Sequence, residues 1–284
     1  MAENKIKNIK LNNGIEMPPI GLGVFQIPDW KECERCVCDA VEIGYRAIDT
    51  ARTYYNEEAV GEGIRHCGLK REELFITSKL AVIDTGYEKT LKAFSDTLKK
   101  LKTDYLDLYL IHHAYGDCYG SWRAMEKLYK EGYIRAIGVS NFEPYRLVDL
   151  VMNHEIVPAI DQTETHPYCQ QKKLKETLKE WDIKLTASEG LAQGMRGLFT
   201  DPTFTKIGEK YGKTAAQVVL RWHVQRGDII IPKSTHKERM IENFNVFDFE
   251  LTKEEMEAFD PYDTGEGIIV DRRDPERVKM YFGK

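Results

Sequence analysis

The sequence predicts an α/β protein in which eight strand–helix units close into a single (β/α)8 barrel, the TIM-barrel fold. Strand-like and helix-like segments alternate from residue 20 to residue 260, and no Pro/Ser-rich linker or low-complexity stretch interrupts them. Five strings with chemically useful residues also fall at the ends of expected strands, and a closed parallel barrel gathers these ends on one face. We predict one domain over residues 1–284, because α/β barrels of about 250 residues are single domains.

The expected barrel strands are short apolar runs, as buried parallel strands usually are. They cover residues 20–24, 46–49, 75–79, 106–112, 134–140, 159–163, 183–187 and 229–232. Right-handed crossovers are the only common way to join such strands. Before them, residues 8–16 contain the turn Asn12-Asn13-Gly14, which predicts an N-terminal β-hairpin at the bottom of the barrel.

Helices are expected between the strands. The first would begin after Asp29 as its N-cap, with Glu32 three residues later, and would end at Gly44. The others are expected at residues 57–66, 87–101, 120–130, 144–153, 172–181, 214–226, 237–243 and 252–259.

The rival α/β architecture is a doubly wound dinucleotide fold. Its glycine fingerprint would have to come from Gly21-Leu22-Gly23. The third glycine position is Gln26, and Pro28 breaks the chain soon after it. The sequence therefore favours the barrel.

Composition excludes several classes of partner. The chain has 41 Lys and Arg against 46 Asp and Glu, a net charge of −5, and these charges are spread along the sequence. No basic stripe predicts binding to nucleic acid or to an anionic membrane. No apolar stretch approaches the length of a membrane span, about 18 residues. Residues 1–5 lack a secretory hydrophobic region, which predicts a cytoplasmic protein.

The six cysteines, at positions 33, 36, 38, 67, 118 and 169, are expected to be reduced thiols. The cluster Cys33-x-x-Cys36-x-Cys38 could be a redox or metal site, but it lies in an expected helix and no zinc-spaced partner pair follows it. The adjacent His112 and His113 could also suggest a metal. Neighbouring strand residues face opposite ways, so we expect no shared ion and predict no metal site.

Side chains that could take part in catalysis fall at the ends of three successive expected strands. Asp49 ends one expected strand, Lys79 the next and His112 the one after, while Tyr54 follows Asp49 by five residues. Taken singly, the charged residues could be a structural ion pair and the histidine a packed core residue. Together, the spacing indicates a catalytic set.

These motifs resemble those of the aldo-keto reductase family, and the resemblance runs from about Leu11 to Glu276. They are DTARTYYNE (49–57), ITSKL (76–80), DLYLIH (107–112), IGVSNF (137–142), DQTETHP (161–167) and IPKSTHKERMIEN (231–243). The short loops and brief tail are most similar to the bacterial, diketogluconate-reductase-like branch. The resemblance implies a (β/α)8 barrel, NADPH as cofactor, a small carbonyl substrate that is reduced to an alcohol, and a monomer.

The catalytic set can be assigned roles from chemistry. Carbonyl reduction needs a hydride at carbon and a proton at oxygen, and Tyr54 would supply the proton. A phenol is a poor acid unless a cation or hydrogen bond favours its ionised form, which Lys79 could do while a buried ion pair with Asp49 holds the lysine. His112 would orient the carbonyl oxygen or relay the proton. Tyr55 would be structural or lie at the pocket rim.

The cofactor residues implied by the resemblance fall in three groups. Amide and hydroxyl groups that could fix a nicotinamide carboxamide belong to Ser140, Asn141 and Gln162. Groups suited to the 2′-phosphate of NADPH belong to Lys233, Ser234 and Arg239, and Arg239 could also stack on adenine. The adenine edge would face Glu242 and Asn243. Ser188 and Leu191 occupy the loop that would contact the nicotinamide ring.

The chain departs from the family pattern around the expected substrate pocket, which we assign to Phe25, Ala81, His113 and Tyr115. Ala81 replaces a common Trp, His113-Ala114 replaces Trp or Gln followed by Pro, and Ser188 replaces an aromatic residue. An aromatic side chain buries about 150–250 Å², so these changes predict a widened site. Alternatively, Phe25, Tyr115 or Tyr119 refills the space.

Two points remain open at the level of sequence. The string at residues 271–275 could border the substrate pocket or form a surface ion-pair cluster. The main functional hypothesis is an NADPH-dependent reductase of aldehydes or ketones. The alternatives are a nicotinamide-nucleotide-binding regulatory protein with little turnover, and a barrel enzyme with non-redox chemistry on a phosphorylated substrate held by Lys233 and Arg239.

Overall fold

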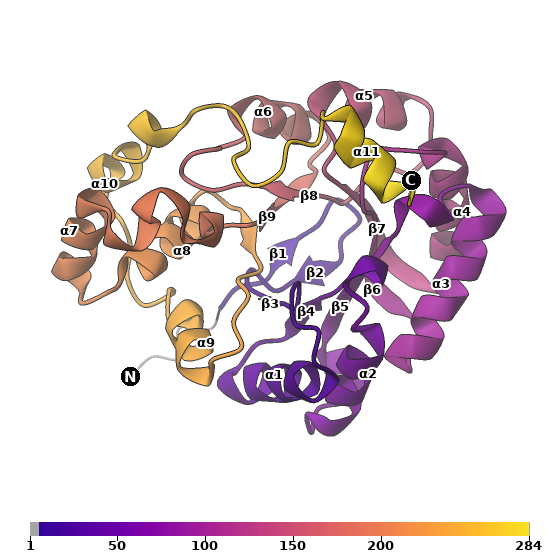
Figure 1. Ribbon diagram of the computed structural model, residues 1–284, viewed down its shortest axis with the longest axis horizontal. Helices are drawn as coiled ribbons and strands as arrows, with labels where there is room; N and C mark the ends of the chain where they lie inside the picture. The colour runs from indigo at the N-terminus through magenta and orange to yellow at the C-terminus, as the bar shows by residue number, and fades with distance from the viewer. Residues whose placement is uncertain (1–5, 284) are drawn as a thin grey trace.

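The computed structural model describes residues 6–283 and shows eight parallel strands curled into a barrel with helices around it (Figure 1). Each strand pairs in parallel with the next along the chain, from β3 to β10. The predicted fold class is confirmed. The strands are β3 (Leu22–Gly23), β4 (Ala47–Asp49), β5 (Phe75–Leu80), β6 (Leu106–Ile111), β7 (Ile134–Ser140), β8 (Ile160–Glu164), β9 (Lys184–Ser188) and β10 (Ile229–Ile230).

The barrel closes where the first strand meets the last. Ile20 and Ile230 form a parallel bridge, and the Gly21 N–H donates to the Ile230 carbonyl at 2.9 Å. At Gly23, a Cβ atom would lie 2.7 Å from the Ile231 carbonyl oxygen, so only glycine fits there. The glycines that a dinucleotide fingerprint would have used therefore serve close approaches to neighbouring segments, Gly21 to Ala47 of β4 and Gly23 to Ile231.

The predicted N-terminal hairpin is present and covers the bottom of the barrel. Strands β1 (Ile9–Lys10) and β2 (Glu16–Met17) are antiparallel. The Asn12 side chain donates to the Pro158 carbonyl and the Asn13 side chain to the Arg135 carbonyl, both at 2.9 Å. These carbonyls lie at the start of β8 and β7, opposite the strand ends that carry the reactive residues.

The predicted helices all form, with small differences at their ends. Helix α1 has Asp29 as N-cap, whose side chain accepts from the Glu32 N–H, and it ends at Gly44 in a left-handed conformation (φ 127°). The helices are α1 (Trp30–Ile43), α2 (Glu57–His66), α3 (Tyr87–Leu101), α4 (Cys118–Lys130), α5 (Pro144–Met152), α6 (Lys172–Glu180), α7 (Pro202–Tyr211), α8 (Ala215–Gln225), α9 (Lys237–Phe244), α10 (Lys253–Glu257) and α11 (Pro275–Tyr281).

Two of these helices and several 3-10 turns are additions to the prediction. Helices α7 and α11 each follow an aspartate N-cap with proline at the first position, a start signal that was present in the sequence. The 3-10 segments are η1 (Arg52–Tyr54), η2 (Arg71–Glu73), η3 (Val82–Asp84), η4 (Ala192–Thr200) and η5 (Asp260–Tyr262).

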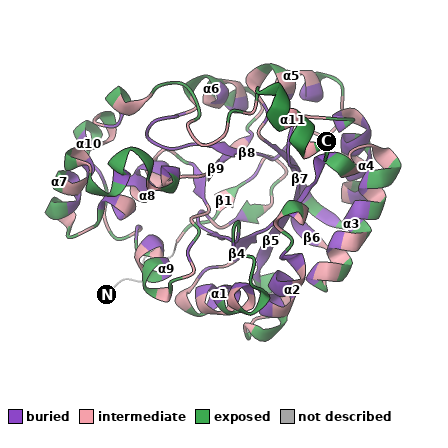
Figure 2. Ribbon diagram, in the orientation of Figure 1, coloured by how far each residue is buried: buried purple, intermediate pink, exposed green. Residues whose placement is uncertain are grey.

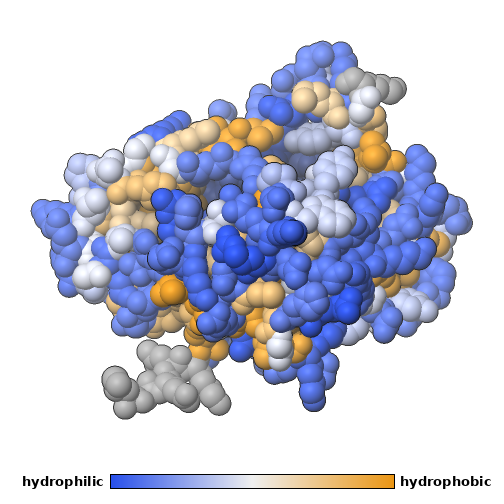
Figure 3. Space-filling model, turned by 60° about the horizontal axis from the view of Figure 1, so that its bottom comes forward, coloured by the Kyte–Doolittle hydropathy of each residue, from blue (hydrophilic) through white to orange (hydrophobic). Residues whose placement is uncertain are grey.

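Burial follows this architecture: the strands are buried and the outer faces of the helices are exposed (Figure 2). The face drawn in Figure 3 is mainly hydrophilic, with hydrophobic residues in a few groups. None of the helices in the described part of the chain could span a bilayer.

The cysteine cluster packs into the protein instead of forming a reactive centre. All six cysteines are free, and Cys33 and Cys36 are buried on the inner face of α1. Burial raises the pKa of Cys33 to about 12 and that of Cys36 to about 11, which keeps both thiols protonated and weakly nucleophilic at neutral pH. Within residues 6–283 no group of three or more His, Cys, Asp or Glu could hold a metal ion.

Candidate active site

The fold brings Asp49, Lys79 and Tyr54 of the expected catalytic set into contact. Asp49 ends β4, Lys79 lies in β5, and the 3-10 turn η1 returns Tyr54 over both. The fully buried Lys79 ammonium donates to Asp49 Oδ1 at 2.5 Å, to the Thr50 carbonyl at 2.9 Å and to the Tyr54 hydroxyl at 3.4 Å. An ammonium has three N–H groups, so these contacts use all of them and fix its position.

Burial and charge act in opposite directions on this pair. Burial raises the pKa of Tyr54 above its usual value, and the neighbouring Lys79 lowers it by a smaller amount. Burial lowers the pKa of Lys79, but Asp49 and Tyr54 raise it further, so the net shift is upward. Lys79 thus favours the ionised phenol, as expected, but burial outweighs it and the net shift of the Tyr54 pKa is upward. Tyr54 is protonated at neutral pH, which is the form that can give up a proton.

His112 and His113 form a ring stack beside the phenol. The Tyr54 and His112 rings meet edge to face at 5.7 Å, and Thr53 Oγ1 lies 3.3 Å from His112 Nδ1. The rings of His112 and His113 are parallel and 4.6 Å apart. The expectation that they face opposite ways is wrong, because β6 ends at Ile111 and the alternation of strand side chains no longer applies.

Both histidines are neutral at neutral pH. Burial is the main cause: it lowers the pKa of His112 well below 6.5 and that of His113 to about 3, with smaller effects from Lys79 and Arg272. A Thr53 hydroxyl that donates to His112 Nδ1 leaves the other ring nitrogen carrying a proton. His112 can then donate a hydrogen bond to a carbonyl oxygen without carrying a charge.

The C-terminal segment covers this ring stack. Tyr281 of α11 packs on His113 at 4.2 Å and lies 5.8 Å from Tyr115, whose hydroxyl donates to the Arg272 carbonyl. The buried Glu164 carboxylate holds the segment, because Oε2 accepts from Arg272 at 3.0 Å and Oε1 accepts from the backbone N–H groups of residues 268 and 269. Of the two possibilities for residues 271–275, Arg272 supports the first, while Arg273 pairs with Glu143 on the surface.

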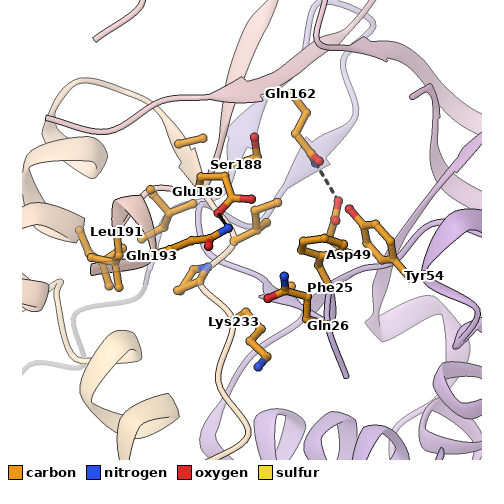
Figure 4. A pocket seen from close by; sticks show the side chains of 17 residues that line it. Phe25, Gln26, Asp49, Tyr54, Gln162, Ser188, Glu189, Leu191, Gln193 and Lys233 are labelled. Carbon is orange, nitrogen blue, oxygen red and sulfur yellow. Dashed lines mark hydrogen bonds between the residues drawn. The ribbon is translucent and has the colours of Figure 1, made fainter. Parts of the chain in front are cut away.

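A cavity of about 400 Å³ opens beside Tyr54 at the strand ends (Figure 4). Its lining comes from strands β3, β4, β8, β9 and β10, from η1 and α8, and from the loops that follow β3, β9 and β10. Among the residues predicted from sequence, it is lined by Phe25, Asp49, Tyr54, Gln162, Ser188, Leu191 and Lys233.

The amide residues are arranged with acceptor oxygens to spare. Gln162 Nε2 donates to Asp49 Oδ2 at 2.8 Å, and no hydrogen bond within the described residues uses its oxygen. Asn141 Nδ2 donates to the His112 carbonyl at 2.9 Å and to Ser140 Oγ at 3.0 Å, while Asn141 Oδ1 is buried without a partner. Two amide oxygens thus match the donors of a carboxamide NH₂ group, and the residues present fit a nicotinamide.

The residues expected at the phosphate end lie along the last strand and α9. Lys233 is exposed at the rim of the cavity, and Arg239 is exposed on α9. Ser234 is buried and its hydroxyl accepts from the His236 N–H at 3.1 Å. The Glu242 carboxylate accepts from Thr214 at 2.5 Å. None of Ser234, Arg239, Glu242 and the buried Asn243 lines the cavity.

The expected substrate pocket is only partly an open space. Phe25 is exposed and packs on Tyr54 at 4.9 Å. Ala81 is buried (3% exposed) and lies outside the cavity lining, so it does not leave an open gap. Tyr119 does not refill the site, because it stacks on His154 and donates to Asp149 on the outer side of the barrel.

Sequence reasoning missed several residues around the site. Thr53 contacts His112, Gln26, Glu189 and Gln193 line the cavity, and Glu164 anchors the C-terminal segment. Thr53 and Glu164 stand inside the quoted motifs, so their position was a usable signal. The loop residues 189 and 193 gave none, because their place depends on left-handed backbone conformations.

The contact of Asp49, Lys79 and Tyr54 at the strand ends of a barrel, next to a cavity with polar groups suited to a nicotinamide, is the arrangement expected of a barrel-fold oxidoreductase. A family model described as the Aldo/keto reductase family matches residues 19–263. The chain belongs to the aldo-keto reductase family.

Relatives place the chain within this family. It is 49% identical to glyoxal reductase of Bacillus subtilis over 261 residues, covering 92% of this chain and 94% of that protein. It is 42% identical to the methylglyoxal reductase DkgA of Escherichia coli over 266 residues, covering 93% and 96%. The predicted bacterial branch is confirmed. The crystal structure of a Bombyx mori aldo-keto reductase in complex with NADP superposes with a TM-score of 0.89 at 35% identity, covering 95% and 96%.

Proposed function

We propose that this chain is an NADPH-dependent reductase of aldehydes or ketones in which Tyr54 protonates the carbonyl oxygen. One observation carries the proposal: the protonated Tyr54 hydroxyl and the Lys79 ammonium meet at 3.4 Å beside a cavity lined by Gln162, whose amide oxygen accepts no hydrogen bond from the described residues. The NADP complex of a Bombyx mori relative supports the choice of nucleotide.

The chain's own residues would divide the work as follows. The hydride for the carbonyl carbon would come from NADPH bound in this cavity. Tyr54 donates its proton to the oxygen, and the fixed Lys79 ammonium stabilises the phenolate that forms. Asp49 keeps Lys79 charged and in place, and also orients Gln162 through the 2.8 Å hydrogen bond. Neutral His112 donates a hydrogen bond that orients the carbonyl oxygen.

The same residues would hold the nucleotide. Asn141 Oδ1 and the Gln162 oxygen would accept from the carboxamide, which selects the ring face that donates the hydride. Ser140 supports Asn141, because its hydroxyl accepts from Asn141 and donates to the Gln162 carbonyl at 2.7 Å. Ser188 and Leu191 would lie against the ring. Lys233, Ser234 and Arg239 would bind the 2′-phosphate, with Glu242 and Asn243 near adenine.

The proposal is tested by loss of nicotinamide absorbance with a panel of carbonyl compounds. Glyoxal and methylglyoxal head the panel, because two relatives are named as reductases of these compounds. We expect oxidation of NADPH with at least one small dicarbonyl and slower oxidation of NADH. Binding of NADPH without oxidation across the panel would instead favour the second candidate, a regulatory protein, which the missing aromatic residue at position 188 supports.

A substitution at Ser188 tests the widened site. Ser188 lines the cavity and is partly exposed, so Ser188→Tyr would place a ring against the nicotinamide position. We expect tighter NADPH binding and a loss of about tenfold in kcat/KM for bulky aldehydes relative to small ones. Ser188→Ala is the matched control and should change neither the affinity for NADPH nor the preference between bulky and small aldehydes. An unchanged preference in Ser188→Tyr would contradict a widened site.

Three further expectations stay proposals. We propose that residues 1–284 form one domain, that the protein acts as a monomer, and that it is cytoplasmic. Limited proteolysis checks the single domain, analytical ultracentrifugation checks the monomer, and fractionation of cells checks the location.

A further inference from the structure

The loop after β9 forms one wall of the cavity in a conformation that needs support. Ser188, Glu189, Gly190, Leu191 and Gln193 line the cavity, and Figure 4 shows Glu189, Leu191 and Gln193 on the side opposite Tyr54. The backbone is left-handed at Glu189 (φ 58°), at Gln193 (φ 51°) and at the intervening residue 192 (φ 47°). Such conformations are unfavourable for residues with a Cβ atom and persist where surrounding contacts hold them.

A buried histidine of α8 supports this loop from inside the protein. His223 is fully buried, and its Nε2 lies 3.2 Å from the Gly190 carbonyl oxygen. A Cβ atom on Gly190 would lie 3.4 Å from the same nitrogen, so the loop packs directly on the ring. On the other side of the ring, Nδ1 lies 3.0 Å from Asp228 Oδ2.

Both ring nitrogens of His223 face hydrogen-bond acceptors. The Gly190 carbonyl can only accept. Burial raises the pKa of Asp228, but His223, Arg226 and Lys175 lower it further, to about 2, so this carboxylate also only accepts. A neutral imidazole has one N–H and can serve one of the two partners, whereas an imidazolium serves both. Full hydrogen bonding therefore requires the protonated ring.

Burial of His223 opposes that protonation, while the neighbouring charges act in both directions. Burial lowers its pKa below 6.5, Asp228 raises it, and Arg226 lowers it. Asp228 also pairs with Lys175 of α6 at 2.5 Å and with Arg226 at 3.5 Å, so two cations compete with the ring for one carboxylate. The Trp222 ring, which meets the His223 ring edge to face at 4.7 Å, is uncharged. His223 therefore gains its proton on the acid side of 6.5, and at neutral pH one of its two hydrogen bonds is lost.

We propose that His223 is a positioning residue that holds loop 188–194 against the cofactor cavity through donation to the Gly190 carbonyl, and that nucleotide affinity rises when His223 becomes protonated. The inference rests on the proposed function, because it takes a nicotinamide nucleotide as the occupant of the cavity. Linkage makes the effect reciprocal: a nucleotide that needs the loop in place favours protonation of the histidine.

Two variants separate the two ring nitrogens. In His223→Gln the side-chain amide can reach the position of Nε2 and donate to Gly190 at any pH. In His223→Asn the shorter amide reaches only the position of Nδ1, next to Asp228. The dissociation constant of NADPH is measured for both and for the unaltered protein, by fluorescence titration, from about pH 5.5 to about pH 8, a range that spans the ordinary titration of histidine.

We expect His223→Asn to bind NADPH about five- to tenfold more weakly than His223→Gln, the effect of one lost hydrogen bond. The unaltered protein should bind NADPH as tightly as His223→Gln does at acid pH, and more weakly than that variant as the pH rises. The ratio of these two dissociation constants at each pH is the quantity compared, because the titration of the nucleotide's own phosphate affects both equally. Equal dissociation constants for the two variants would overturn the proposal. A ratio of the unaltered protein to His223→Gln that is independent of pH would also overturn it.

Hydrogen exchange without nucleotide gives a second readout that does not depend on the proposed function. The N–H groups of Ala192 and Gly194 are bonded within the loop, at 2.6 and 2.9 Å. In the unaltered protein their protection, corrected for intrinsic exchange rates, should fall as the pH rises. Protection that stays constant with pH overturns the inference even if both variants fail to fold. Absence of NADPH binding in every protein, with pH-dependent loop protection, would reject the proposed function alone.

Discussion

Tyr54→Phe is expected to lower the turnover number about 10²- to 10⁴-fold, the usual contribution of a general acid, while NADPH still binds. The substitution removes only the hydroxyl that lies 3.4 Å from Lys79 and keeps the ring that packs on Phe25 and His112. Steady-state kinetics with a small aldehyde and a separate titration of NADPH measure the two effects.

Tyr55→Phe is the matched control, because Tyr55 is the neighbouring tyrosine but is 81% exposed. An exposed hydroxyl away from other groups contributes little, so its loss should change turnover by no more than about twofold. Equal losses in the two variants would reject Tyr54 as the proton donor.

Lys79→Met should affect both catalysis and stability. Without the ammonium, nothing stabilises the phenolate, and we expect turnover to fall about 10²- to 10³-fold. The substitution also leaves the Asp49 carboxylate, only 4% exposed, without its cation. Breaking a buried pair in this way costs about 3–5 kcal/mol of the free energy of unfolding. Chemical denaturation measures this loss.

The double variant Asp49→Asn, Lys79→Met separates the two effects. It removes the unpaired charge, so stability should recover most of the loss while turnover stays low. The stability that the unaltered protein gains from the Asp49–Lys79 ion pair should depend on pH with a definite sign. Because the folded protein raises the pKa of Lys79 above 10.5, the ion pair contributes fully below that pH and is lost as the pH rises through the folded value. A double variant as unstable as Lys79→Met would show that the ion pair is not the cause.

Much of the fold follows from local signals. The start of α1 at Asp29 and its end at Gly44 follow from one capping side chain and one glycine, and these act over a few residues. The barrel strands could be predicted because each is a short apolar run bounded by polar residues. Asp49, Lys79 and Tyr54 could be placed together because a barrel collects its strand ends on one face.

The parts that sequence reasoning missed depend on contacts between distant segments. The stack of His112 on His113 follows from where β6 ends, by a single residue. The packing of Tyr281 on His113 joins the C-terminal helix to a loop near the middle of the chain. Ala81 was expected to open the pocket, yet whether an alanine leaves a gap depends on its neighbours in space, and here they bury it.

The contact that closes the barrel has a consequence for protein synthesis. Residues 20–23 pair with residues 230–232, so nearly the whole barrel must leave the ribosome before the two strands can meet. Until then, the growing chain exposes β3 as an unpaired edge, and unpaired edges promote aggregation. Late closure of this kind also makes folding slow, since contacts between distant residues form last. We therefore expect the free edge of β3 to be exposed to wrong pairing until the last strand has been made.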